Sequence, residues 1–221
     1  MGVQLPIFPL GVVLFPGMTL PLHIFEERYR ALVQDLLDAG VDEPCFGVVA
    51  IRDGYEVGEL AVHSAHRVGC EAVLSEAERR PDGTFDIETV GRRRLHVDDM
   101  DESRPYLVAS VTYLEEPPGV GVEQARAQAL AAFEAYRLRM DEMRGTRIDI
   151  SAMPRDPRTL SYALAAGGLF MLSDRQQLLE TPDTADRLTR LARLLRSETA
   201  AMTALPSLPA TDVVRTGWYP N

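Results

Sequence analysis

The sequence contains no lysine: all 23 of its basic residues, in a chain of 221, are arginines. A chain without lysine lacks the lysine of a phosphate-binding P-loop, of a serine-lysine dyad and of a Schiff base, because each of these needs a compact or tunable amine. We prefer a base composition that favours arginine codons over any selected role as the explanation of this absence, because arginine and lysine interchange freely on most solvated surfaces. These enzyme classes are excluded whichever cause is right.

Other catalytic and metal-binding signatures are also missing. No G-x-S-x-G, H-E-x-x-H, G-x-G-x-x-G or EF-hand pattern occurs in the sequence. The nearest approach to a metal cluster is His63, His66 and Cys70, with His96 further along. In an extended chain His63 and His66 point to opposite faces, so they read as ordinary strand histidines. No metal and no cofactor are therefore predicted.

The two cysteines, Cys45 and Cys70, are too far apart for a C-x-x-C motif, and each lies in an apolar run. This pattern predicts buried, reduced thiols, as in a cytoplasmic protein. A catalytic role for Cys45 is not expected, because a thiol inside an apolar strand is inert.

Positive charge is scarce in the first half of the chain. The net charge is -10, and residues 1–114 hold 19 acids and 10 arginines, against 14 and 13 in residues 115–221. An acidic surface repels phosphate, so nucleic-acid binding is not expected. Only Arg92, Arg93 and Arg94 form a basic run, which we interpret as a solvated strand end.

The N-terminal stretch up to Ile24 has no acidic or basic residue except His23, which raises the question of a signal peptide or membrane span. Four prolines would break a helix there, and no positively charged n-region precedes it. We therefore expect buried extended chain and no membrane interaction.

The periodicity of apolar residues divides the chain into a strand-rich part and a helical part. A helix from Phe25 to Gly40 follows the first two strands, and Pro81-Asp82-Gly83 predicts a hairpin turn. The predicted strands are Val3–Leu14, Met18–Ile24, Cys45–Ile51, Leu60–His63, Val68–Ala77, Thr84–Val90, Arg94–Val97 and Tyr106–Leu114. Many short strands with one early helix predict a closed or nearly closed antiparallel barrel.

Pro117-Pro118-Gly119 marks a boundary, after which the pattern is helical. One helix carries an apolar seam from Ala129 to Met143, and others are predicted to start at Asp156-Pro157, at Ser173 with Gln176 in capping-box spacing, and at Thr181-Pro182. The predicted organisation is α+β, with a barrel over residues 1–116, a helical bundle over 120–205 and an irregular tail over 206–221. In this tail we expect Trp218 and Tyr219 to dock back onto the body, in preference to binding a partner.

The stretch from Leu5 to Arg30, LPIFPLGVVLFPGMTLPLHIFEERYR, strongly resembles the opening of the Lon protease N-terminal domain family. Further agreement lies in Phe46–Val49, Val68–Ala72, Gly91–Leu95, Gln177–Glu180 and Asp186–Leu188. The resemblance implies a PUA-like antiparallel β-barrel with one early helix, followed by a helical bundle. It also implies that Phe8, Phe15 and Phe25 fill the barrel and hold the first helix against it.

In full-length Lon this region precedes an ATPase and a serine-lysine protease and helps to recognise unfolded substrates. The chain therefore resembles a free-standing, non-catalytic cytoplasmic protein that binds unfolded or extended polypeptide, alone or with a separate protease or chaperone. An exposed strand edge is one way to hold such a ligand. Near loop signals, Leu10, Phe15 and Met18 are candidate peptide contacts, with burial in the core as the alternative reading. Two other functions stay open: an RNA-binding PUA-like module, and an enzyme with a small-molecule pocket where barrel and bundle meet.

Overall fold

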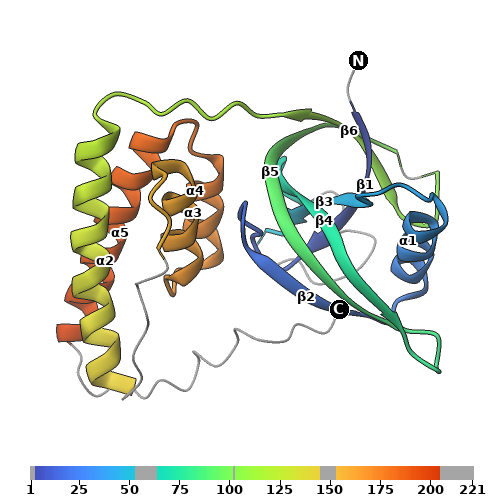
Figure 1. The fold of residues 1–221 in the computed structure, drawn as a ribbon, viewed down its shortest axis with the longest axis horizontal. Coiled ribbons are helices and arrows are strands. Elements are labelled where there is room, and N and C mark those ends of the chain that lie inside the picture. The colour runs from blue at the N-terminus through green and yellow to red at the C-terminus, as the bar shows by residue number, and fades with distance from the viewer. Residues whose placement is uncertain (1–2, 53–63, 102, 145–152, 205–221) are drawn as a thin grey trace. The chain divides into compact units, whose positions relative to one another are not determined.

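The computed structural model of the chain describes residues 3–52, 64–101, 103–144 and 153–204. The fold is mixed α+β and divides into two compact units (Figure 1). The first unit holds the strands up to Leu114 together with Met171–Leu179, and the second holds Glu115–Phe170 and the described residues from Glu180 onward. The predicted strand Leu60–His63 and the tail with Trp218 and Tyr219 lie outside the described residues.

Six strands of the first unit form one sheet. Their order is β2-β5-β4-β3-β1-β6, and β6 pairs with β5 as well as with β1. The pairings therefore run in a circuit through β5, β4, β3, β1 and β6, with β2 outside it. The bounds are β1 Val3–Leu10, β2 Thr19–Ile24, β3 Cys45–Ala50, β4 Val68–Arg79, β5 Phe85–Asp101 and β6 Leu107–Tyr113.

One pair of strands corrects the expectation of a wholly antiparallel sheet. β1 and β3 run parallel, with Ile7 beside Gly47 and Leu10 beside Ala50. A parallel pair needs a connection that returns the chain to its starting end. Here β2 and the helix α1 (Glu27–Asp38) lie between the two strands in sequence and make that return.

A second correction concerns β5, which was predicted as two short strands and is one strand of 17 residues. Gly91 lies at the predicted break, and a Cβ there would stand 2.2 Å from the backbone oxygen of Phe15. Because Gly91 has no side chain, the segment from Phe15 to Met18 can pass close to β5, and Gly91 N–H donates to Met18 O at 2.9 Å. Glycine at this position therefore allows a close backbone approach without ending the strand.

The core of the first unit lies on both faces of β1. Phe8 packs in one cluster with Phe46, which includes the buried side chains of α1, and Ile7 packs in the other with Leu95. Strands buried on both faces read as continuous apolar runs, which is why the N-terminal stretch lacks charge. Phe15 is buried as expected, whereas Phe25 precedes α1 and is 43% exposed, so the expected packing role of Phe25 is wrong.

In the described part of the second unit three helices pack together: α2 (Val122–Arg144), α3 (Pro157–Gly167) and α5 (Thr184–Ala204). The predicted start of α3 is confirmed, since the Asp156 side chain accepts from Thr159 N–H at 2.8 Å and Pro157 is the first helical residue. α5 begins later than predicted because Asp183, two residues after Thr181, caps it by accepting from Asp186 N–H.

The fourth helix, α4 (Leu172–Glu180), was predicted as part of the helical half, but all of it except Glu180 groups with the sheet. Gln176 Nε2 donates to Val68 O at 2.9 Å, and Arg94 Nη1 donates to Leu179 O at 2.8 Å. Ser173 lies inside α4, so the predicted capping box is wrong. Gln176 instead ties the helix to β4, a contact between distant parts of the chain that local spacing does not encode.

Candidate functional site

The hairpin formed by β4 and β5 has a register that fixes where its backbone groups point. Arg80 N–H donates to Thr84 O at 2.8 Å, and this pair closes the hairpin around the turn at Gly83, whose φ is 85°. Hydrogen-bonded and non-hydrogen-bonded pairs alternate along an antiparallel ladder. Glu76 and Glu78, opposite Glu88 and Asp86, therefore bond to β5. The backbone groups of Ala77 and Arg79 point the other way.

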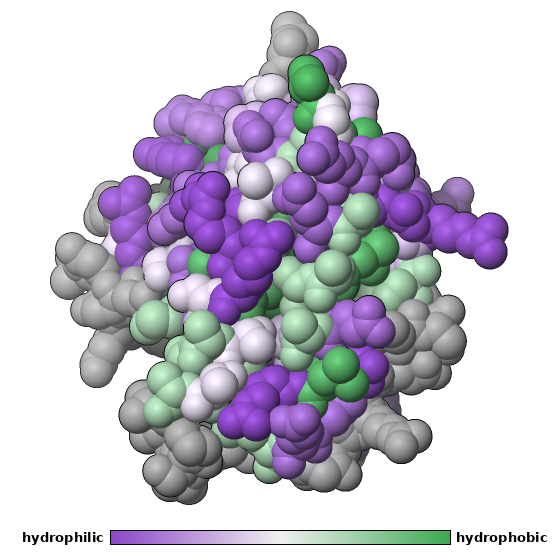
Figure 2. Space-filling view, turned by 90° about the vertical axis from the view of Figure 1, so that its left-hand side faces the viewer, coloured by the Kyte–Doolittle hydropathy of each residue, from purple (hydrophilic) through white to green (hydrophobic). Residues whose placement is uncertain are grey.

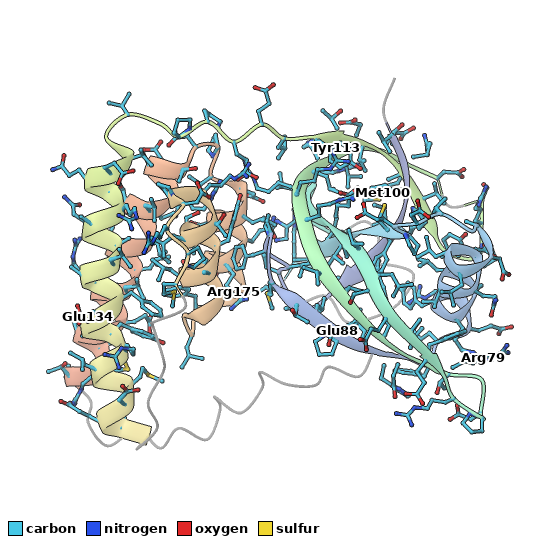
Figure 3. The ribbon with its side chains drawn as sticks, in the orientation of Figure 1. Arg79, Glu88, Met100, Tyr113, Glu134 and Arg175 are labelled. Atoms are coloured by element: carbon cyan, nitrogen blue, oxygen red, sulfur yellow. The ribbon has the colours of Figure 1, made fainter. Side chains whose placement is uncertain are left out.

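The outward side of this segment has no strand beside it within the described residues. β3 pairs with β4 over Cys70–Val73, whereas Glu76–Arg79 pair with β5 alone. Ser75 lies in a register shift between Leu74 and Glu76, and Ser75–Arg79 are all exposed. We call the unpaired side of Ser75–Arg79 the β4 edge. Figure 3 shows Arg79 near the hairpin tip and Glu88 further back along β5. Unpaired backbone donors and acceptors on an exposed strand can accept another strand.

The side of β2 that faces away from β5 is the other strand edge of this sheet, and a proline in β2 disfavours strand pairing there. Because the backbones of Asp86 and Glu88 of β5 bond to β4, the intervening residues of β5 bond to β2. Pro21, which lies opposite Glu88 in the middle of β2, therefore has its backbone directed outward. Proline has no N–H and is a common protection for edge strands. The β4 edge has no proline. It is thus the better of the two for strand pairing.

Beside the hairpin turn lies a pocket of about 400 Å³, lined by His23, Arg80, Pro81, Asp82, Thr84 and Asp86. Asp86 is the centre of its charge network: His23 Nδ1 lies 2.6 Å from Oδ1, and Arg80 Nε donates to Oδ2 at 2.6 Å. These hydrogen bonds with His23 and Arg80 lower the pKa of Asp86. The pocket walls are thus held together by the ion pair between Arg80 and Asp86 and by the hydrogen bond between His23 and Asp86.

Glu71 on β4 is fully buried and gathers several donors. Arg92 Nε and Arg93 Nε donate to its Oε2 at 2.6 and 2.9 Å, and Tyr113 OH donates to Oε1. Burial alone would raise the pKa of Glu71, but these hydrogen bonds outweigh it and lower the pKa to about 2. Burial and the nearby Glu71 charge raise the pKa of the Cys45 thiol, which disfavours the reactive thiolate.

The arginine run lies within β5 and not at a strand end, so that part of the interpretation is wrong, whereas the side chains of Arg92 and Arg93 are exposed as expected. Arg92 and Arg93 pair with Glu71, while Arg94 is only 1% exposed and donates to Leu179 O. The guanidinium of Arg93 also stacks on the Tyr113 ring, 3.4 Å from its centroid. These contacts leave the three side chains as supports within the first unit.

A groove of about 470 Å³ runs between α2 and α5 and is lined by Ala132, Ala135, Arg196, Thr199, Ala200, Thr203 and Ala204. Figure 2 shows weakly hydrophobic residues between hydrophilic clusters on the side of the molecule that it draws. Apart from Arg196, the lining side chains are those of alanine and threonine, which do not distinguish one occupant from another. The β4 edge, whose geometry specifies an extended chain, is therefore the stronger candidate.

A sequence model described as the ATP-dependent protease La (LON) substrate-binding domain matches residues 4–197. The chain belongs to this Lon family. It is 31% identical over 187 residues to Lon protease 1 of Thermus thermophilus, an alignment that covers 82% of this chain and 23% of that protein. Lon protease of Escherichia coli is 26% identical over 185 residues, again 82% of this chain and 23% of the relative. The chain thus spans about a quarter of the length of these relatives.

Solved Lon structures share the fold. A Lon N-terminal domain protein from Xanthomonas campestris has a TM-score of 0.62 at 24% identity and covers 86% of this chain and 98% of that one. The N-terminal domain of a Mycobacterium avium complex Lon protease has a TM-score of 0.65 at 17% identity and covers 90% and 98%. These similarities extend over both units of the chain.

Within this Lon domain, the residues expected to contact peptide lie mostly inside. Leu10 and Phe15 are 5% and 0% exposed, in the core of the first unit, and Met18 is half-buried. The guanidinium of Arg175 on α4 lies 5.2 Å from the centroid of the Phe15 ring, and its Nη2 lies 3.8 Å from Met18 Sδ. The β4 edge was missed because exposure along Ser75–Arg79 depends on where β3 stops pairing.

The structure bears on the histidine and cysteine cluster and on membrane-spanning helices only through the residues that it describes. His63 lies outside the described residues, and within them no group of three His, Cys, Asp or Glu side chains is placed to hold a metal ion. Cys70 is buried and its Sγ donates to the backbone oxygen of Glu71. No described helix combines the length and the hydropathy that crossing a bilayer requires.

Proposed function

We propose that this Lon substrate-binding-domain chain binds extended polypeptide by adding a segment of it as a strand on the β4 edge. The observation that carries the proposal is the register of the hairpin, which directs the backbone of Ala77 and Arg79 away from β5 on a fully exposed segment. Strand addition takes most of its affinity from main-chain hydrogen bonds, so it tolerates varied sequences. That property suits a domain whose family is described by substrate binding.

The proposal replaces Leu10 and Phe15 as ligand contacts, because buried side chains would have to leave the core first. We also propose the finer architecture that the resemblance implies, in which the circuit of strands is a PUA-like barrel and the second unit is a helical bundle. The proposal assigns the chain no catalytic step, and it allows action beside a separate protease or chaperone. RNA is a poorer candidate ligand, because Glu71 and the Leu179 carbonyl already occupy Arg92, Arg93 and Arg94.

Ala77→Pro should weaken binding of an unfolded model polypeptide by about tenfold or more, because it removes an outward N–H and places a ring on the edge. The hairpin itself should persist, since the Ala77 N–H does not bond to β5. Fluorescence anisotropy with a labelled, permanently unfolded polypeptide measures the affinity, and circular dichroism checks the fold.

Ala77→Ser is the matched control, because it changes the same side chain and keeps the N–H. It should bind like the parent protein. Equal binding by Ala77→Pro and the parent would remove the β4 edge from the mechanism. Absence of saturable binding by the parent at any accessible concentration would refute the function as well.

A further inference from the structure

The outer face of the hairpin sets acids opposite acids. In the register of β4 and β5, Glu76 is the direct partner of Glu88, and Glu78 is the direct partner of Asp86. All four side chains share one face, because alternate residues of a strand point the same way and the intervening Phe85 and Ile87 are buried. Like charges directly opposite each other destabilise a sheet.

Only some of these four acids have a basic side chain beside them. Asp86 is paired with Arg80 and His23, whereas Glu76 and Glu88 form no ion pair within the described residues. Arg79 does not neutralise them, because it lies on the other face, with its guanidinium 5.8 Å from the centroid of the Phe85 ring. One cross-strand carboxylate pair is therefore left exposed and uncompensated next to the β4 edge.

A strand added on the β4 edge would set every second side chain beside Glu76 and Glu78. Opposite charges at such cross-strand positions stabilise a sheet, and like charges oppose it. Cationic side chains two residues apart on the ligand would thus relieve the repulsion already present in the hairpin. Over a longer range, residues 1–114 carry a net charge of -9, a field that attracts cations and repels anions.

From this charge pattern we infer that the β4 edge selects extended segments with lysine or arginine at alternate positions and disfavours acidic ones. The inference rests on the proposed function and names the substrate class of the same edge. The relevant ligand is a cationic stretch of polypeptide in β conformation. An amphipathic helix or a nucleic acid would not match the two-residue spacing of Glu76 and Glu78.

The test compares three labelled ten-residue peptides that alternate threonine with lysine, glutamine or glutamate, titrated by fluorescence anisotropy at low and at high salt. The lysine peptide should bind about fivefold to tenfold more tightly than the glutamine peptide at low salt, as expected for two favourable cross-strand pairs. The glutamate peptide should bind most weakly. High salt should reduce these differences, because the charges are exposed.

The double variant Glu76→Gln, Glu78→Gln, which removes both acids beside the added strand, should lose most of the preference for lysine and bind the glutamine peptide as the parent does. Its fold should be retained, since the change removes a repulsion. Glu134→Gln, an exposed acid on α2, is the matched control and should change none of the three affinities.

The outcomes separate the two proposals. Equal affinity for the three peptides, or a lysine preference that survives in the double variant, overturns the charge selection while strand addition stands on the Ala77→Pro result. If none of the peptides binds, although the unfolded polypeptide binds and Ala77→Pro abolishes that binding, the charge selection alone is overturned. If neither the peptides nor the polypeptide bind, both proposals are overturned.

Discussion

Replacing Arg187 with methionine should lower the free energy of unfolding by about 3–5 kcal/mol, because it leaves a buried carboxylate without its cation. Arg187 is fully buried on α5 and donates to Glu116 Oε2, Ser161 Oγ and Thr181 O at 3.2, 3.0 and 3.2 Å. Its guanidinium also lies 4.2 Å from the centroid of the Tyr162 ring. Urea denaturation followed by circular dichroism at 222 nm measures the loss.

Two further variants test that explanation. Adding Glu116→Gln to Arg187→Met should recover about 1–2 kcal/mol of the loss, since the carboxylate is then no longer charged and buried. Arg193→Met, at an exposed position on the same helix, should change stability by no more than about 0.5 kcal/mol. A double variant no more stable than Arg187→Met alone would show that the ion pair is not the cause.

Glu71→Gln should cost on the order of 3 kcal/mol at pH 7, and the cost should depend on pH. Burial opposes the charge of Glu71, but the hydrogen bonds from Arg92, Tyr113 and Arg93 lower its pKa from 4.5 to about 2. A carboxyl whose pKa is lowered by folding contributes stability above its unfolded pKa and loses it as the pH falls toward the folded value. The difference between parent and variant should therefore shrink between about pH 5 and pH 2.

Denaturant unfolding at a series of pH values measures that difference directly. Glu134→Gln supplies the reference, because Glu134 is exposed and has no ion pair in the part of the chain that the structure describes, so its replacement should give a small difference that changes little with pH. A constant gap between Glu71→Gln and the parent from pH 7 to pH 3 would contradict the role of the ionised carboxylate. The general effect of acid on this acidic chain cancels, since both proteins experience it.

Much of the local structure could be predicted from residue chemistry. Gly83 and Pro81 indicated the hairpin turn, Asp156 and Pro157 the start of α3, and the 3.6-residue period the course of α1 and α2. These signals act over a few residues, through backbone conformation and capping. The errors arose where distant segments meet: Gly91 passes Phe15, and Gln176 reaches Val68.

The candidate site shows the same limit. Leu10 and Phe15 lie near loop signals in the sequence, which left exposure and burial both open, and tertiary packing buries both. Ser75–Arg79 has no motif, and it becomes an edge only because β3 stops pairing at the level of Val73. The arginine run looks like a basic patch until Glu71, more than twenty residues earlier, is placed beside it.

The sequence by itself determined which chemistry this chain lacks. Without lysine it has no P-loop cation and no serine-lysine dyad, and its N-terminal stretch is distinctive enough to indicate the Lon domain family. Only the tertiary structure decided which charges and which backbone groups face solvent. The physical reason is that burial and strand pairing depend on residues far apart in the chain, whereas residue type is fixed at each position.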